Sequence, residues 1–296
     1  MNRVLQLDKG VALFISDIQG NREDFDQALF LYQLLKKNKA CDYFVICGDL
    51  IHGYPGYPDD SFSLLKQVMK LKESDPGIIL LLGNHELAHI VHWGLQKGFI
   101  SFTDTFEENL KEDRAVYWEF LNSLPFALYT SGGLMVNHTG TSAAMAGEKS
   151  EDWDLLLSIT PPHLWYQNFD FEKEFKIKQE QKDQFDGPFG QKIQESPMGK
   201  LLWEVFMNKN EYAYRKKHDR IVEGFHENMS KIAPFDVLIS SHIEEKEGYK
   251  VVHDRHFRLC TSYGARDQQS KKYLLLDVAA KIESAQQLVP QLRNLW

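Results

Sequence analysis

Short apolar runs alternate with polar loops and helical segments through the first half of the chain. The runs Val11–Ser16, Tyr43–Cys47 and Ile78–Leu82 each end in a loop rich in Gly, Asp, Asn or His. After the first run, apolar residues recur at helical spacing: Phe25, Ala28, Leu29, Tyr32 and Leu35. This alternation predicts an α/β fold whose strands deliver polar residues from their carboxyl ends, where open α/β sheets build ligand sites.

The second half predicts more strands around a long helical stretch. Phe126–Thr130 and Leu134–Asn137 flank a Gly turn, and Phe235–Ser240 runs into His242. We expect residues 147–233 to form a charged helical insertion or cap, broken at Gln184–Gly190. Its expected anchors are Trp153, Trp165 and Trp203. Near the end of the chain, three alternating runs predict a second, antiparallel layer: Tyr249–Val252, Phe257–Cys260 and Tyr273–Val278.

Composition narrows the class of protein. The 296 residues are 43% hydrophobic and 26% charged, and no linker-like tract divides them, so we expect one domain over residues 1–296. A net charge of −8 argues against a nucleic-acid polymer as partner. Three cysteines are too few for a disulfide framework and favour the cytoplasm. The chain has no apolar stretch at its start and no long apolar run, so we expect no signal peptide and no membrane partner.

The polar residues at the strand ends form the candidate chemistry. They are Asp17, Asp49, the segment Gly83-Asn84-His85-Glu86, His138 and His242. Each alone could cap a helix or shape a turn. Together, carboxylate, amide and imidazole groups suit a pair of divalent cations about 3.5–4 Å apart, which needs a bridging carboxylate. We expect Asp49 to be that bridge.

These motifs resemble the calcineurin-like metallophosphoesterases, and among them the phosphoprotein phosphatases. The likeness is strongest at Gly83–Glu86, which matches the family's Gly-Asn-His-Glu, and at Ser241–Tyr249, which is similar to its last histidine segment. The resemblance implies an α/β fold, a β-sandwich of two mixed sheets flanked by helices, with the 147–233 insertion beside the mouth of the site.

The resemblance also implies roles for individual residues. Asp17 would bind the first metal, with Gln19 as a further ligand; Asp49 would bridge both metals. Asn84, His138 and His242 would hold the second metal, and His85 would protonate the leaving oxygen. A phosphate-clamping arginine would fall at Arg215, with Arg220 close by. The implied cofactors are two divalent metal ions, with manganese expected and iron, zinc or magnesium as alternatives.

Two departures from the family pattern stand out. Gln19 replaces the first-motif histidine, which predicts a weaker, harder first site that prefers manganese or magnesium to iron or zinc. In the segment after Asp49, His52 stands where the family has a carboxylate that orients the catalytic histidine. His89 and His92 are interpreted as ordinary helix positions, because no carboxylate joins them in the sequence. Glu86 is interpreted as a first-turn residue without a chemical role.

The leading functional hypothesis is hydrolysis of phosphate monoesters by a metal-activated water, with phosphoserine, phosphothreonine or phosphotyrosine on a protein as the expected substrate. The expected partner is therefore a phosphorylated protein or a small phosphoester. A second hypothesis is a dinucleoside polyphosphate hydrolase, since the diadenosine-tetraphosphatase branch shares these motifs. A third is a non-catalytic phospho-binding module whose centre has decayed at Gln19 and at His52.

Overall fold

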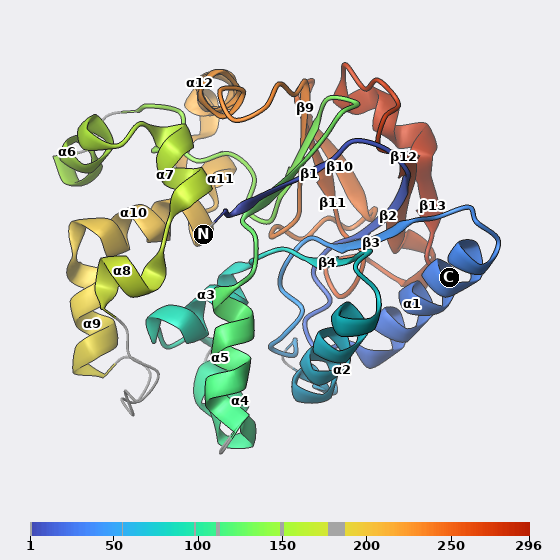
Figure 1. Ribbon diagram of the computed structural model, residues 1–296, viewed down its shortest axis with the longest axis horizontal. Helices are drawn as coiled ribbons and strands as arrows, with labels where there is room; N and C mark the ends of the chain where they lie inside the picture. The colour runs from blue at the N-terminus through green and yellow to red at the C-terminus, as the bar shows by residue number, and fades with distance from the viewer. Residues whose placement is uncertain (1, 55, 98, 111–112, 149–150, 177–186) are drawn as a thin grey trace.

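Two mixed β-sheets form the centre of the computed structural model, which describes residues 2–54, 56–97, 99–110, 113–148, 151–176 and 187–296 (Figure 1). The first sheet has the order β1-β7-β8-β9-β11-β10. Its strands are β1 (Val4–Leu7), β7 (Ala127–Thr130), β8 (Leu134–Asn137), β9 (Val237–Ser240), β10 (Tyr249–His253) and β11 (His256–Leu259). Parallel pairs join β1 to β7, β8 to β9 and β9 to β11, whereas β7–β8 and β10–β11 are antiparallel.

The second sheet has the order β13-β12-β2-β3-β4. Its strands are β2 (Val11–Ile15), β3 (Tyr43–Ile46), β4 (Ile78–Leu80), β12 (Lys272–Asp277) and β13 (Leu292–Asn294). Strands β2, β3 and β4 are parallel, so their carboxyl ends share one edge. A short hairpin of β5 (Gln96–Lys97) and β6 (Ile100–Ser101) lies apart from both sheets.

The alternation of side chains along the strands divides the apolar core in two. Phe14 and Val45 of the second sheet share one cluster with Val136 and Ile239 of the first, which fills the space between the sheets. Their neighbours along the strands, such as Leu13, belong to the other cluster, which packs against the helices. Successive side chains of a strand point to opposite faces, so sheets buried on both faces need apolar residues at nearly every position.

Helices cover the outer faces of both sheets. Helices α1 and α2 lie on one side in Figure 1, and α6–α11 lie on the other. The helices before residue 147 are α1 (Arg22–Lys37), α2 (Ser61–Ser74), α3 (Asn84–Val91), α4 (Phe102–Leu110) and α5 (Arg114–Asn122). Those in the predicted insertion are α6 (Glu151–Ile159), α7 (Pro162–Asn168), α8 (Phe171–Phe175), α9 (Pro188–Glu195), α10 (Pro197–Phe206), α11 (Asn210–Tyr214) and α12 (His218–Met229). Turns of 3-10 helix occur at Arg215–Lys217, Gln268–Ser270 and Ala285–Gln291.

The predicted fold of two mixed sheets flanked by helices is confirmed, with strand ends displaced by one or two residues. The prediction that the runs after residue 248 form a separate antiparallel layer is wrong. Strand β11 runs parallel to β9 and extends the first sheet, while β12 joins the second sheet beside β2. An alternating pattern predicts a strand but does not select its partner, because pairing depends on packing against residues far away in the chain.

Two details of the helical stretch also differ from expectation. The predicted break at Gln184–Gly190 lies partly outside the described residues, and α9 already begins at Pro188, where proline suits the first helical turn. Trp165 is a buried anchor, as predicted. Trp203 is 43% exposed and is not one, although its ring lies 5.8 Å from that of Trp93. The side chain of Trp153 lies outside the described part of the chain. Among the described helices, none combines the length and apolarity needed to span a bilayer.

Candidate metal centre

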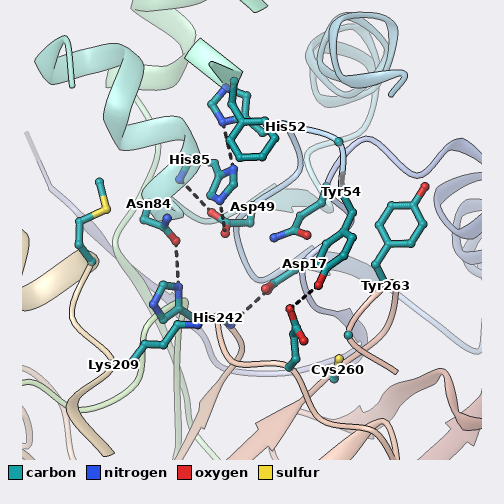
Figure 2. Close-up of a pocket in the computed structure, with 16 residues that line it drawn as sticks. Asp17, Asp49, His52, Tyr54, Asn84, His85, Lys209, His242, Cys260 and Tyr263 are labelled. Carbon is teal, nitrogen blue, oxygen red and sulfur yellow. Dashed lines mark hydrogen bonds and ion pairs between the residues drawn. The ribbon is translucent and has the colours of Figure 1, made fainter. Parts of the chain in front are cut away.

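The polar residues at the strand ends meet in one pocket of ≈280 Å³ (Figure 2). Asp17 follows β2, Asp49 follows β3, and Asn84 opens helix α3 after β4. His138 comes directly after β8, and His242 comes shortly after β9. The predicted site residues that line this pocket are Asp17, Gln19, Asp49, Asn84, His85 and His242, and His138 is buried beside them.

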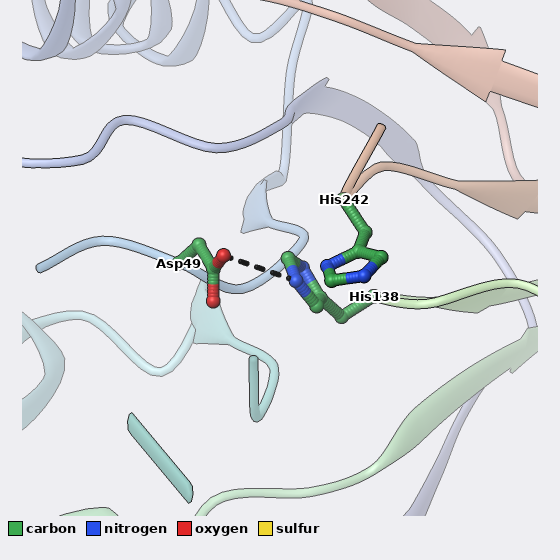
Figure 3. Close-up of side chains that lie close together, drawn as sticks. All are labelled: Asp49, His138 and His242. Carbon is green, nitrogen blue, oxygen red and sulfur yellow. Dashed lines mark ion pairs between the residues drawn. The ribbon is translucent and has the colours of Figure 1, made fainter. Parts of the chain in front are cut away.

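Four of these side chains point their donor atoms at a common centre. Asn84 Oδ1 lies 2.9 Å from His138 Nε2 and 2.9 Å from His242 Nδ1. His138 Nε2 is also 3.2 Å from Asp49 Oδ2. Asp49, His138 and His242 offer ligand atoms that all lie within 4.8 Å of one another (Figure 3). A carboxylate, an amide oxygen and two imidazoles form a donor set that divalent transition metals accept.

The surroundings of the two histidines fit a cation. Burial alone would lower the pKa of His138, but the charges of Asp49, Asp17 and Glu86 raise it to about 9, which shows how strongly negative this centre is. His138 Nδ1 lies 2.9 Å from the Cys47 carbonyl, a contact that orients the ring and turns Nε2 to the centre.

The ring of His242 behaves in the opposite way. Burial, reinforced by the charge of His138, lowers the pKa of His242 to about 3, so this imidazole is neutral at physiological pH. Its Nε2 is buried and has no hydrogen-bond partner within the described residues. A buried polar atom without a partner is costly, and a neutral imidazole is the form that binds metals. The donor set fits a metal site, with His242 Nδ1 facing the centre.

Asp49 sits in a tight turn that only small neighbours permit. Burial opposes its ionisation, yet the charges of His138 and His85 hold the pKa of Asp49 well below the usual range. A Cβ on Gly83 would lie 2.2 Å from Asp49 Oδ1, and a Cβ on Gly48, whose φ is +94°, would lie 2.7 Å from His138 Nδ1. Both glycines are therefore required by close approach at the centre.

Glu86 holds this turn in place. Its side chain is fully buried, and its Oε2 accepts the backbone N–H groups of Asp49 and Gly83 at 2.9 and 3.0 Å. Its Oε1 accepts those of Leu50 and Ile51 at 2.9 and 3.3 Å. Glu86 does lie in the first turn of α3, as interpreted, and its carboxylate also has a structural task that the sequence pattern did not show. The carboxylate ties the loop after β3 to the start of α3, a link across distant sequence that local pattern cannot show.

Asp17 and Gln19 form the other wall of the centre. Asp17 Oδ1 accepts the backbone N–H of His242 at 3.2 Å and lies 3.8 Å from His138 Nδ1. Burial raises the pKa of Asp17 above its usual value, against the opposing charge of His138. Gln19 adopts a φ of +46°, and its N–H donates to the Asp49 carbonyl at 2.9 Å. A positive φ is unusual outside glycine, and such residues concentrate at functional sites.

His85 lies at the edge of the centre, next to Asp49. Its backbone N–H donates to Asp49 Oδ1 at 3.0 Å, and its Nε2 lies 3.6 Å from Asp49 Oδ2. Burial lowers the pKa of His85, partly offset by the charge of Asp49. Behind the ring, His85 Nδ1 lies 3.0 Å from His52 Nδ1.

His89 lies in helix α3, as interpreted, but a carboxylate does join its ring, contrary to expectation. His52 Nε2 lies 2.7 Å from His89 Nε2, and His89 Nδ1 lies 2.7 Å from Glu107 Oε1. The carboxylate comes from helix α4 rather than from the local sequence, so no spacing rule could have found it. His92 is buried at the C-terminal end of α3, where its φ is +57°.

The structure does not bring Arg215 to the pocket. Arg215 lies in an exposed 3-10 turn, and Arg220 is 77% exposed and pairs with Glu148. Among the described residues that line the pocket, Lys209 is the only lysine or arginine, and Figure 2 shows it beside His242. Lys209 lies in the turn between α10 and α11, and nothing in its local sequence distinguishes it from the other lysines.

Aromatic residues form the outer wall of the pocket. Tyr54 and Tyr263 line it, with ring centroids 5.7 Å apart, and Tyr57 lies 4.5 Å from Tyr263. The Tyr54 hydroxyl donates to Glu244 Oε1 at 2.9 Å. The aromatic wall is therefore held by contacts between two loops that are distant in sequence.

The sequence matches a protein family over most of its length and individual proteins over a short segment. Residues 11–243 match the family described as calcineurin-like phosphoesterase. The serine/threonine-protein phosphatase CPPED1 of Bos taurus is 35% identical over 57 residues, which are 19% of this chain and only 18% of that protein.

Two solved structures resemble the whole fold. A cold-active protein-tyrosine phosphatase of a psychrophilic Shewanella species has a TM-score of 0.51 at 15% identity, over 93% of this chain and 77% of that one. A protein serine/threonine phosphatase from Saccharomyces cerevisiae, with similarity to human phosphatase PP5, has a TM-score of 0.53 at 14% identity, over 93% and 76%. At such identities the likeness establishes the fold alone.

Proposed function

The chain belongs to the calcineurin-like phosphoesterase family and is a metal-dependent phosphoesterase, and on this premise we propose that it is a dinuclear-metal phosphatase acting on phosphate monoesters. Phosphorylated protein side chains are the proposed substrates. The observation that carries the proposal is the convergence of Asp49, Asn84, His138 and His242 on one centre, with His85 beside it.

The residues of the centre have separate tasks in this proposal. Asp49 would be shared by the two ions, Asp17 and Gln19 would complete one site, and Asn84, His138 and His242 would complete the other. When bound, the two divalent ions, for which we propose manganese, would supply the activation of water and the neutralisation of phosphoryl charge that this reaction needs. Glu86 keeps the Asp49 turn rigid, so the ligands need little rearrangement.

His85 donates the proton to the leaving oxygen. Its backbone contact with Asp49 Oδ1 holds the ring against the centre, and its side chain is 15% exposed, so Nε2 faces the pocket rather than bulk solvent. Positioned proton donors of this kind contribute about 10²–10⁴-fold to rate. We therefore expect His85→Ala to retain metal and substrate binding while losing most of kcat.

Lys209 is the proposed phosphate-binding cation in place of Arg215. An ammonium at the rim attracts the phosphoryl group before reaction and in the transition state. We expect Lys209→Ala to lower kcat/KM about tenfold to a hundredfold, which corresponds to the loss of about 1.4–2.8 kcal/mol. Arg215→Ala is the matched control and should leave kcat/KM within a factor of two. The reverse ranking would return the clamp to Arg215.

The test of the function compares substrates on one preparation. The purified chain, loaded with manganese, is assayed on para-nitrophenyl phosphate, on phosphoserine and phosphotyrosine peptides, and on diadenosine tetraphosphate. Turnover of the monoesters, abolished in Asp49→Asn and reduced in His85→Ala, supports the proposal. Turnover confined to the dinucleotide makes the chain a nucleotide hydrolase. If the wild type is as inert as both variants on every substrate, the chain is a binding module.

A further inference from the structure

A line of hydrogen-bonded side chains leads from the back of His85 away from the pocket. His85 Nδ1 contacts His52 Nδ1 at 3.0 Å, and His52 Nε2 contacts His89 Nε2 at 2.7 Å. His89 Nδ1 then contacts Glu107 Oε1 at 2.7 Å, and Glu107 Oε2 pairs with Arg114 Nε at 2.7 Å. Each contact is within hydrogen-bond distance, so the line is continuous.

The line is enclosed rather than exposed. His52 and His89 are each about 1% exposed. The ring of Phe102 stacks on His52 at 5.7 Å. Phe106 packs edge-on against His52 at 5.7 Å, and its ring is tilted against that of His89 at 4.9 Å. Two imidazole rings buried among phenylalanines would be costly without hydrogen bonds, and the line supplies them.

The backbone around His52 is built to hold it in this position. Its φ is +69°, in the left-handed region, and its N–H donates to Ser61 Oγ at 2.7 Å. Ser61 in turn donates to Asp59. A non-glycine residue in this conformation persists only where the surrounding contacts impose it.

We propose that His52, His89 and Glu107 form a relay that fixes the ring orientation and the tautomer of His85. The inference rests on the proposed role of His85 as proton donor, and it assigns to the three residues a positioning role. His52 lines the pocket, but its two ring nitrogens contact His85 and His89 rather than a proposed metal ligand.

The direction of each hydrogen bond follows from the carboxylate at the far end. Glu107 is ionised and can only accept, so His89 Nδ1 carries a proton. With that single ring proton, His89 accepts at Nε2. His52 must donate from Nε2 and accept at Nδ1, so His85 donates from Nδ1. This leaves Nε2 of His85, which faces Asp49, as the nitrogen where a proton is taken up and released.

The charges at the far end agree with this assignment. Burial would raise the pKa of Glu107, but the hydrogen bond from His89 and the charge of Arg114 hold it below its usual value. Burial lowers the pKa of His52 well below that of free histidine, so its ring is neutral. A neutral imidazole in the middle of the line can donate at one nitrogen and accept at the other.

The first test reads the tautomers directly and does not depend on turnover. Protein labelled with ¹⁵N in its histidine rings is examined by long-range ¹H–¹⁵N correlation, with and without magnesium, at about pH 8, above the ordinary pKa of imidazole. We expect the Nδ1–H form for His85 and His89 and the Nε2–H form for His52. Signals are assigned from His85→Gln and His52→Asp spectra. An Nε2–H tautomer of His85 overturns the proposal.

The second test uses the geometry of aspartate. In His52→Asp a carboxylate oxygen occupies nearly the place of Nδ1, so it can accept the same proton from His85 but cuts the line to His89. We expect His52→Asp to keep kcat within about fivefold of wild type, and His52→Ala to lose about 10²-fold on phenyl phosphate, with KM little changed. The loss should be smaller on para-nitrophenyl phosphate, whose leaving group needs less protonation.

The third test introduces Glu107→Ala into the wild type and into His52→Asp. The matched control is Glu108→Ala, on the exposed face of the same helix. Glu107→Ala should lower kcat about tenfold in the wild type and leave it unchanged in His52→Asp, where the line is already cut. Equal losses in both backgrounds would make Glu107 a structural residue and overturn the relay. Turnover by the wild type with no effect of any relay variant overturns the relay but spares the proposed function. An inert wild type removes the proposed function, and the relay's role with it.

Discussion

Replacing Glu86 by Gln should destabilise the protein although the two side chains have the same shape. Glu86 is fully buried and accepts four backbone N–H groups, two at each carboxylate oxygen. A glutamine has one oxygen and one NH₂ group. Whichever way its amide turns, the NH₂ faces two N–H donors, either those of Asp49 and Gly83 or those of Leu50 and Ile51.

The magnitude follows from the number of donors that lose their partner. A buried donor left unsatisfied costs about 1–3 kcal/mol. Two such donors place the loss of unfolding free energy for Glu86→Gln at about 3 kcal/mol. Glu86→Ala strips all four donors but opens space for water to replace part of the carboxylate, so we expect a loss of about 3–5 kcal/mol.

The assay is urea unfolding of the metal-free protein, followed by circular dichroism. Burial and the charge of Asp49 raise the pKa of Glu86 to about 7, so the measurement is made at about pH 8, where the wild-type side chain is ionised. The control is Glu223→Gln, because this glutamate is 55% exposed and its contact with Arg255 contributes at most about 1 kcal/mol. If the free energy of unfolding of Glu86→Gln lies within 0.5 kcal/mol of that of the wild type, the Glu86 carboxylate does not hold the Asp49 turn as described.

Three further predictions concern the metal, the thiols and acid stability. Chelation should abolish turnover, and manganese should restore it. At a metal concentration a hundredfold above Kd, manganese should raise the free energy of unfolding of the wild type by about 2.7 kcal/mol and leave that of Asp49→Asn unchanged. Equal stabilisation of the wild type and Asp49→Asn would place the ion elsewhere. Burial raises the pKa of Cys41 to about 11 and that of Cys260 to about 12. Both thiols should therefore react slowly with Ellman's reagent at neutral pH until urea unfolds the chain. Fast labelling of the folded protein would contradict this. Burial of Asp75 opposes its ionisation, but the hydrogen bond from Lys36 at 2.5 Å holds the pKa of Asp75 below its ordinary value of 3.8. As pH falls, the unfolded chain therefore takes up this proton before the folded one does, and the stability that the ionised Asp75 contributes above pH 3.8 is lost in acid. The free energy of unfolding from urea titrations should fall less steeply with pH in Asp75→Asn than in the wild type, and a parallel fall would contradict this.

The composition of the centre was readable from the sequence because each of its residues lies just after an apolar strand. Asp17, Asp49, Asn84, His138 and His242 are each placed by the end of a strand, and parallel strands bring such ends to one edge of a sheet. The fold of two mixed sheets was likewise readable, from the alternation of strands and helices together with the likeness to a known family.

The parts that sequence missed are contacts between distant segments. Strand order at the C-terminal end depends on which sheet edge is free to pair, so β11 joins β9 and β12 joins β2. The basic residue at the pocket depends on where the chain turns after α10, which places Lys209 at the rim and leaves Arg215 outside.

Sequence alone therefore determined the strands, their polar ends and the kinds of ligand gathered there, since these follow from local hydrophobic period and residue chemistry. Tertiary structure decided how those ligands are supported. Glu86 reaches back to the Asp49 turn, and Glu107 reaches His89 from another helix, because burial obliges each polar group to find a partner wherever the packed chain provides one.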